Sequence, residues 1–126
     1  MNPRVTKKDR ALIKGALRRV FSRSELRRKA LDRQRIEFTD GKRPRVTAWV
    51  WCAVCGLVFP RYLAVVDHIS PLVPIGKTAE EMSAEEIVDR LWCEENNLQA
   101  LDKECHKLKS RIESKARREY KKGNIK

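Results

Sequence analysis

A cysteine and a histidine stand side by side at Cys105-His106, in a stretch whose apolar spacing predicts a helix. Neighbouring residues on a helix point about 100° apart, so these two side chains do not face one target. We therefore expect the helix to serve two sites. Cys105 can turn back to the pair Cys52 and Cys55, and His106 then points toward Asp67-His68. The chain of 126 residues must therefore fold so that this one helix contacts both sites.

The cysteine pair lies in Cys52-Ala-Val-Cys55-Gly56, which fits a zinc knuckle because the turn lets two thiolates converge on one ion. Asp102 lies one helical turn before Cys105, and an aspartate oxygen is an accepted zinc ligand. A redox role for the cysteine pair would favour a βαβ context, which the sequence does not show. The pattern therefore favours a structural zinc.

The chain has two histidines, and each stands beside a second ligand type. His68 follows Asp67 at the end of an apolar run, and His106 follows Cys105. Asp67 and His106 could hold a divalent cation while His68, whose ordinary pKa lies near neutrality, activates a water. One such histidine alone would be read as a structural residue, but two of them with a cysteine pair upstream favour a hydrolytic metal site.

The formal net charge is +12, which predicts a polyanionic partner, with nucleic acid ahead of anionic lipid. The charge gathers at the two ends: residues 1–35 carry +10 and residues 107–126 carry +7, whereas residues 77–96 carry −5. No apolar run approaches the ~20 residues of a membrane span. Residues 1–10 lack the apolar region of a signal peptide. We therefore expect a cytoplasmic protein without membrane contact, whose cysteines are thiols or metal ligands rather than disulfides.

Apolar periodicity predicts an α+β fold. Residues 1–40 are expected to form a basic helical extension, a hairpin of helices over 6–20 and 23–36, with a capping box at Ser22 and Glu25. The hairpin could grip DNA phosphates or dock on a protein. In the domain over residues 41–126, strands over 45–51 and 62–69 are expected to pair across the knuckle as an antiparallel hairpin. A capped helix over 84–92, a loop over 93–99 and a basic helix over 102–121 follow.

These motifs in this order resemble the HNH endonuclease family, with its ββα-metal fold, and in particular its short free-standing members in bacteriophages and bacteria. The resemblance covers residues 45–113. It rests on the cysteine pair with Gly56, on Val66-Asp67-His68-Ile69-x-Pro71, on Glu95-Asn96-Asn97-Leu98-Gln99, and on Cys105-His106-x-x-Lys109-Ser110. Family members with this zinc site usually have a second CxxC, where this chain has Asp102-Lys-Glu-Cys105. Asp102 is therefore the leading candidate for the fourth zinc ligand, beside Cys52, Cys55 and Cys105, and Cys93 is its rival.

The resemblance implies a metal-dependent DNA endonuclease that hydrolyses phosphodiester bonds. Asp67 and His106 would bind the catalytic ion, which is Mg²⁺ or else Mn²⁺, Co²⁺ or Ni²⁺. His68 would be the general base, and Asn97 would hold its loop by hydrogen bonding. The expected phosphate contacts are Arg61, Lys107, Lys109 and Arg111. Two alternatives are a non-catalytic zinc module that binds nucleic acid and an accessory of a phage DNA-packaging machine, with a phage or host DNA-processing protein as partner.

Overall fold

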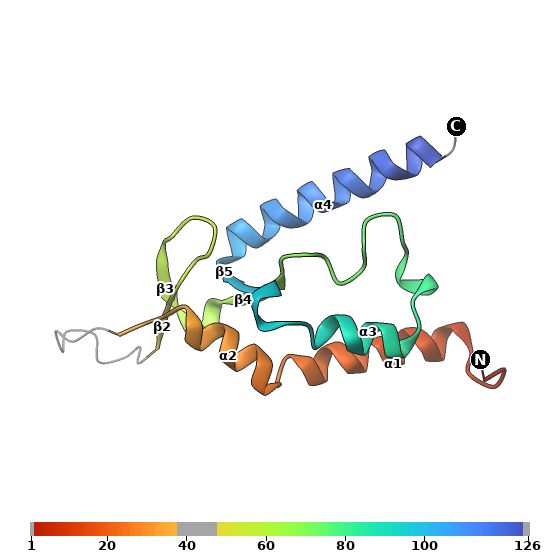
Figure 1. Ribbon diagram of the computed structural model, residues 1–126, viewed down its shortest axis with the longest axis horizontal. Coiled ribbons are helices and arrows are strands. Elements are labelled where there is room, and N and C mark those ends of the chain that lie inside the picture. The colour runs from red at the N-terminus through yellow and green to blue at the C-terminus, as the bar shows by residue number, and fades with distance from the viewer. Residues whose placement is uncertain (1, 38–47, 125–126) are drawn as a thin grey trace.

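The computed structural model describes residues 2–37 and 48–124 and confirms a mixed α+β fold (Figure 1). The boundary expected between the extension over residues 1–40 and the domain over residues 41–126, and the first residues of the strand predicted over 45–51, lie outside the described residues. The helices and strands, in chain order, are α1 (Lys7–Phe21), α2 (Glu25–Arg33), β1 (Arg35–Ile36), β2 (Trp49–Trp51), β3 (Val58–Pro60), β4 (Val65–His68), α3 (Ala84–Leu91), β5 (Leu98–Leu101) and α4 (Lys103–Asn124).

Local hydrogen bonds set the starts of the helices. The predicted capping box of α3 is confirmed. The Ser83 hydroxyl accepts the backbone N–H of Glu86, and the Glu86 carboxylate accepts the backbone N–H of Ser83. The box predicted at Ser22 is wrong, because Ser22 ends α1 and its hydroxyl donates to the carbonyl of Arg19. Ser24 caps α2 instead, accepting the N–H of Arg27 at 3.2 Å.

The strands pair differently from the prediction. β2 pairs with β3 and with β1, and β4 pairs with β5, all antiparallel. The predicted pairing of residues 45–51 with residues 62–69 is therefore wrong. The knuckle reverses the chain within a few residues, with the N–H of Cys52 donating to the carbonyl of Leu57, so β2 meets residues 58–60 first. β4 then pairs with Leu98–Leu101, part of which was expected to be a loop.

The predicted helical hairpin is also wrong. Figure 1 shows α1 and α2 following one another along the molecule with a bend between them, rather than lying antiparallel. α1 packs on α3, and α2 packs on β4 and β5. A buried cluster joins both halves of the chain: Phe21, Ala30, Met82, Ile87, Leu91 and Leu98. The basic helices at the N-terminus thus contribute to the same core as the strands that carry the candidate site.

The end of α2 also covers the outer edge of β5. Gln34 is 3% exposed, and its amide nitrogen donates to the carbonyls of Trp51 and Ala100 at 2.7 and 2.9 Å. Its amide oxygen accepts the N–H of Ala100 at 2.8 Å. Arg33 donates to the carbonyl of Leu98 at 2.6 Å. These bonds satisfy backbone groups that point away from β4 and would otherwise form an open strand edge.

Candidate metal centre

Four residues expected to bind zinc lie together where β2 ends and α4 begins. The ligand atoms of Cys52, Cys55, Asp102 and Cys105 all lie within 4.8 Å of one another. A turn with the N–H of Gly56 bonded to the carbonyl of Cys52 brings the first two thiols side by side, and Gly56 there has φ +76°. Asp102 precedes α4 and accepts the N–H of Cys105 at 2.8 Å. Three thiols and a carboxylate at these distances could hold a metal such as zinc.

The protonation of this cluster also suits a metal. Burial opposes ionisation of Cys52, but backbone N–H groups of Cys55 and Asp102 outweigh it and lower its pKa. A hydrogen bond to Asp102, at 3.0 Å, raises the pKa of Cys55. Burial, together with the neighbouring thiols, raises the pKa of Cys105 to about 12. The metal-free cluster therefore retains protons that a divalent ion would displace on binding.

Cys93, the rival fourth ligand, lies elsewhere. It is half-buried and packs against the hydrophobic cluster that includes Phe21, Ile87 and Leu91. Its surroundings are those of a small buried hydrophobe rather than of a metal ligand. The structure therefore groups Asp102, and not Cys93, with the three other cysteines.

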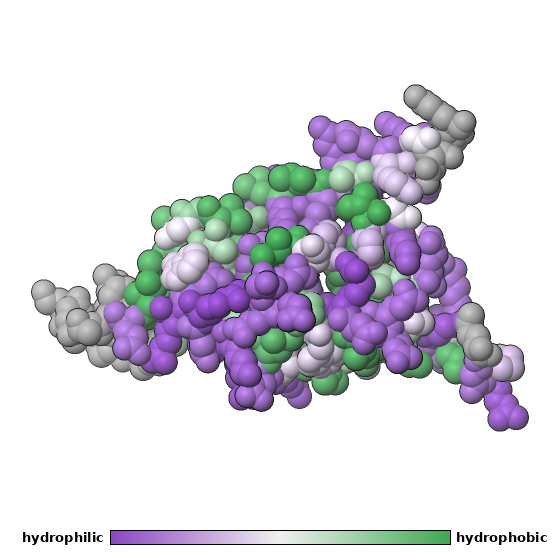
Figure 2. Space-filling view, in the orientation of Figure 1, coloured by the Kyte–Doolittle hydropathy of each residue, from purple (hydrophilic) through white to green (hydrophobic). Residues whose placement is uncertain are grey.

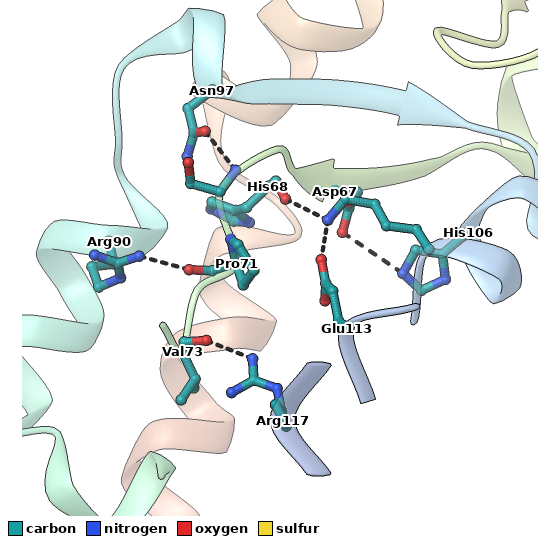
Figure 3. Close-up of polar contacts among 11 residues, drawn as sticks. Asp67, His68, Pro71, Val73, Arg90, Asn97, His106, Glu113 and Arg117 are labelled. Carbon is teal, nitrogen blue, oxygen red and sulfur yellow. Dashed lines mark hydrogen bonds and ion pairs between the residues drawn. The ribbon is translucent and has the colours of Figure 1, made fainter. Parts of the chain in front are cut away.

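A second polar group forms between β4 and α4 around Asp67 (Figure 3). Asp67 Oδ1 lies 3.9 Å from His106 Nε2, so one ion could contact both atoms. Asp67 Oδ2 is buried and has no well-aligned hydrogen bond among the described residues, although the Lys109 ammonium lies 2.8 Å away as an ion pair. The side chain of Asp67 is only 16% exposed. Asp67 is therefore a nearly buried carboxylate with one oxygen turned toward an imidazole.

Lys109 and Glu113 complete this group. The Lys109 ammonium donates to the carbonyl of His68 at 2.9 Å and to the Glu113 carboxylate. Burial opposes the charge of Lys109, but its bonds to Asp67 and Glu113 outweigh burial and raise its pKa. Two carboxylates thus face one ammonium, which leaves one net negative charge when His106 is neutral. Glu113 was not among the expected site residues, although positions 106, 109 and 113 share one helix face and this spacing could have indicated it.

His68 points to the other side of β4, toward α1 and α3. Its Nε2 lies 3.1 Å from the carbonyl of Leu91, and its ring centroid lies 5.4 Å from that of Phe21. A carbonyl only accepts hydrogen bonds, so Nε2 carries a proton, and in the neutral ring Nδ1 is the nitrogen with the free lone pair. His68 is 9% exposed. Its orientation is therefore fixed, and its basic nitrogen is the one that does not face Leu91.

Asn97 braces the chain that follows His68. Its side-chain oxygen accepts the N–H of Ser70 at 2.9 Å, and its backbone carbonyl accepts the N–H of Ile69 at 2.8 Å. Two arginines hold the next residues by their carbonyls: Arg90 binds Pro71 and Leu72, and Arg117 binds Val73 and Pro74. Figure 3 shows the Asn97 contact and those of Arg90 with Pro71 and Arg117 with Val73. The segment between β4 and α3 is thus fixed by β5, α3 and α4.

The residues expected to contact DNA have different environments. Lys107 and Arg111 are exposed on α4, and Lys107 lies 3.9 Å from Glu104. Arg61 pairs with Asp32 at 2.5 Å. Lys109 is committed to Asp67, Glu113 and the His68 carbonyl, so its ammonium faces the protein rather than a ligand.

The surface around these residues is mixed in character. Figure 2 shows hydrophilic side chains over most of the visible face and apolar ones over the knuckle and the first turns of α4. Exposed apolar residues in these segments are Val54, Leu57, Leu108 and Ile112. No helix within the described ranges is both long and apolar enough to cross a membrane.

No known family model matches the chain, and no curated protein or solved structure matches it either.

Proposed function

We propose that the chain is a metal-dependent DNA endonuclease of the HNH type, with β4, β5 and α4 as its ββα-metal core. The observation that carries the proposal is the convergence of Asp67 and His106, 3.9 Å apart, next to the strand end that also carries His68 and the loop that Asn97 braces. A structural metal held by Cys52, Cys55, Asp102 and Cys105, whose ligand atoms lie within 4.8 Å of one another, would anchor the same helix at its first turn.

The residues present fit a divalent ion. The group around Asp67 has one net negative charge when His106 is neutral, and Asp67 Oδ1 faces the His106 imidazole while Oδ2 pairs with Lys109. The Asp67 carboxylate suits Mg²⁺, which keeps several waters and binds substrate phosphate, and the His106 imidazole better suits Mn²⁺, Co²⁺ or Ni²⁺. Bound by Asp67 and His106, the ion would supply positive charge to a phosphate oxygen and to the leaving oxygen.

The proton transfer belongs to His68. Its Nδ1 accepts a proton from the attacking water, and the Leu91 carbonyl, 3.1 Å from Nε2, stabilises the imidazolium that results. Asn97 keeps the residues after His68 in place through the N–H of Ser70. Exposed basic residues on α4, including Lys107 and Arg111, hold the DNA backbone without reading its sequence.

A second candidate is the non-catalytic zinc module that binds nucleic acid. Two observations favour it: the Lys109 ammonium already neutralises Asp67 at 2.8 Å, and His68 is 9% exposed. In this alternative the Asp67 group is an internal ion pair, and the basic ends of the chain provide the function. An accessory role in a phage DNA-packaging machine is compatible with either candidate.

Incubation of supercoiled plasmid with the zinc-loaded protein separates the two candidates. The nuclease predicts cleavage in Mg²⁺ or Mn²⁺ and none with a chelator, and loss of cleavage in Asp67→Asn. The matched control is Asp89→Asn, which removes an exposed carboxylate from α3 and is expected to leave cleavage unchanged. A protein that shifts DNA in a gel but cuts it with neither metal would support the zinc module and contradict the nuclease.

A further inference from the structure

Lys109 places a positive charge inside the group that the proposed function assigns to a divalent ion. Its ammonium has three N–H donors, and it contacts three acceptors: Asp67 Oδ2 at 2.8 Å, the His68 carbonyl at 2.9 Å and the Glu113 carboxylate. The side chain is 20% exposed. A surface lysine that binds phosphate would instead keep its ammonium in water.

We propose that Lys109 is a resident counter-cation, which neutralises Asp67 until a divalent cation displaces it toward Glu113. Lys109 is then a positioning residue, because it sets the charge and orientation of Asp67 without contacting the substrate. The inference rests on the proposed function in one respect, namely that Asp67 and His106 are the residues that bind the divalent ion.

The position of Glu113 supports the exchange. Glu113 lies one helical turn after Lys109 on the same helix, so its carboxylate stays within reach wherever the ammonium moves along that face. Its side chain is 26% exposed, so it shares the partly desolvated surroundings of Lys109. Without Glu113, displaced Lys109 would keep an uncompensated charge beside the incoming cation. Glu113 therefore favours binding of the divalent ion by Asp67, and Lys109 opposes that binding.

Substitutions at these two positions should change metal affinity in opposite directions. In the zinc-loaded chain, with Mn²⁺ as the probe and free Mn²⁺ counted by electron paramagnetic resonance, Lys109→Met is expected to tighten binding on the order of tenfold. Glu113→Gln is expected to weaken it by a similar factor, because Lys109 then pairs with Asp67 alone. A purely structural pair would lose affinity with either change. Lys109→Gln keeps an N–H donor for the His68 carbonyl and is also expected to tighten binding.

The matched controls are Lys115→Met and Glu119→Gln. This pair has the same spacing on α4, at 4.0 Å, but both side chains are mostly exposed. Neither control is expected to change Mn²⁺ affinity more than about twofold, since exposed charges are screened. Asp67→Asn assigns the signal, because it should abolish the binding measured here.

Opposite changes in Mn²⁺ affinity on substitution of Lys109 and of Glu113, with unchanged affinity in the two controls, would support the counter-cation. Unchanged or weaker Mn²⁺ binding in both Lys109→Met and Lys109→Gln would overturn it, as would the absence of Mn²⁺ binding in every variant. The plasmid assay is read separately. If Mn²⁺ affinity shifts as expected while no form of the protein cuts DNA, the nuclease proposal fails and the counter-cation stands.

Discussion

Replacement of Gln34 by leucine tests whether the N-terminal helices and the candidate site form one unit. Gln34 follows α2 and makes three hydrogen bonds, to the N–H and carbonyl of Ala100 in β5 and to the carbonyl of Trp51 in β2. Leucine has a similar volume and none of these bonds. The Ala100 carbonyl retains a partner in the N–H of Ala53 at 3.1 Å. The Ala100 N–H loses its hydrogen-bond partner, and the Trp51 carbonyl loses the bond from the Gln34 amide.

Each buried polar group left without a partner costs about 1–3 kcal/mol, and the added apolar burial offsets part of this. We therefore expect Gln34→Leu to lower the free energy of unfolding by roughly 2–4 kcal/mol, a large fraction of the ~5–15 kcal/mol typical of a small domain. Urea unfolding followed by circular dichroism and by tryptophan fluorescence measures the loss. Gln99→Leu, the same change at a half-buried position in β5, is the control. A loss below about 0.5 kcal/mol for Gln34→Leu would refute the reasoning, because it lies within the range of ordinary surface substitutions.

Three further predictions concern the knuckle and α4. Asp102→Ala should lower bound zinc and melting temperature together, whereas Cys93→Ala should keep its zinc; the reverse result would make Cys93 the ligand. In metal-free protein, the backbone N–H of Cys105 holds the pKa of Asp102 below its ordinary value of 3.8. The stability that ionised Asp102 contributes is therefore present above about pH 4 and lost as the pH falls below it. The melting temperatures of Asp102→Asn and the wild type, measured against pH, should then become equal in acid. Gly76 has φ +96°, and a Cβ there would meet the Tyr120 ring at 2.7 Å. Gly76→Ala should cost roughly 1–3 kcal/mol, and Tyr120→Ala should relieve only the contact part of that loss.

The sequence predicts well what depends on local spacing. The capping box at Ser83 and Glu86 uses residues three apart, and its hydrogen bonds form within one turn. Cys52 with Cys55, and Asp102 with Cys105, have ligand spacings that a turn and a helix end impose. Because thiolates and carboxylates are zinc ligands, these two pairs are expected to bind one ion together, and the cluster follows from the sequence.

What the sequence did not predict depends on contacts between distant residues. β5 has apolar residues without strict alternation, and its partner β4 lies some thirty positions earlier, so its pairing leaves no local signal. Gln34 reads as an ordinary polar residue at a helix end, yet its partners lie 17 and 66 positions away. Lys109 looked like a phosphate contact because basic residues surround it in the sequence. Its neighbour in space is Asp67, which only the packing of α4 on β4 brings near.

The most direct test of the nuclease is the single-turnover cleavage rate of His68→Ala, measured beside its DNA affinity and its melting temperature. Because His68 supplies a proton transfer and no charge for phosphate, we expect cleavage to fall ~10²–10⁴-fold while affinity for DNA stays nearly unchanged. A folded His68→Ala protein that cuts DNA at the wild-type rate would contradict this account of the site.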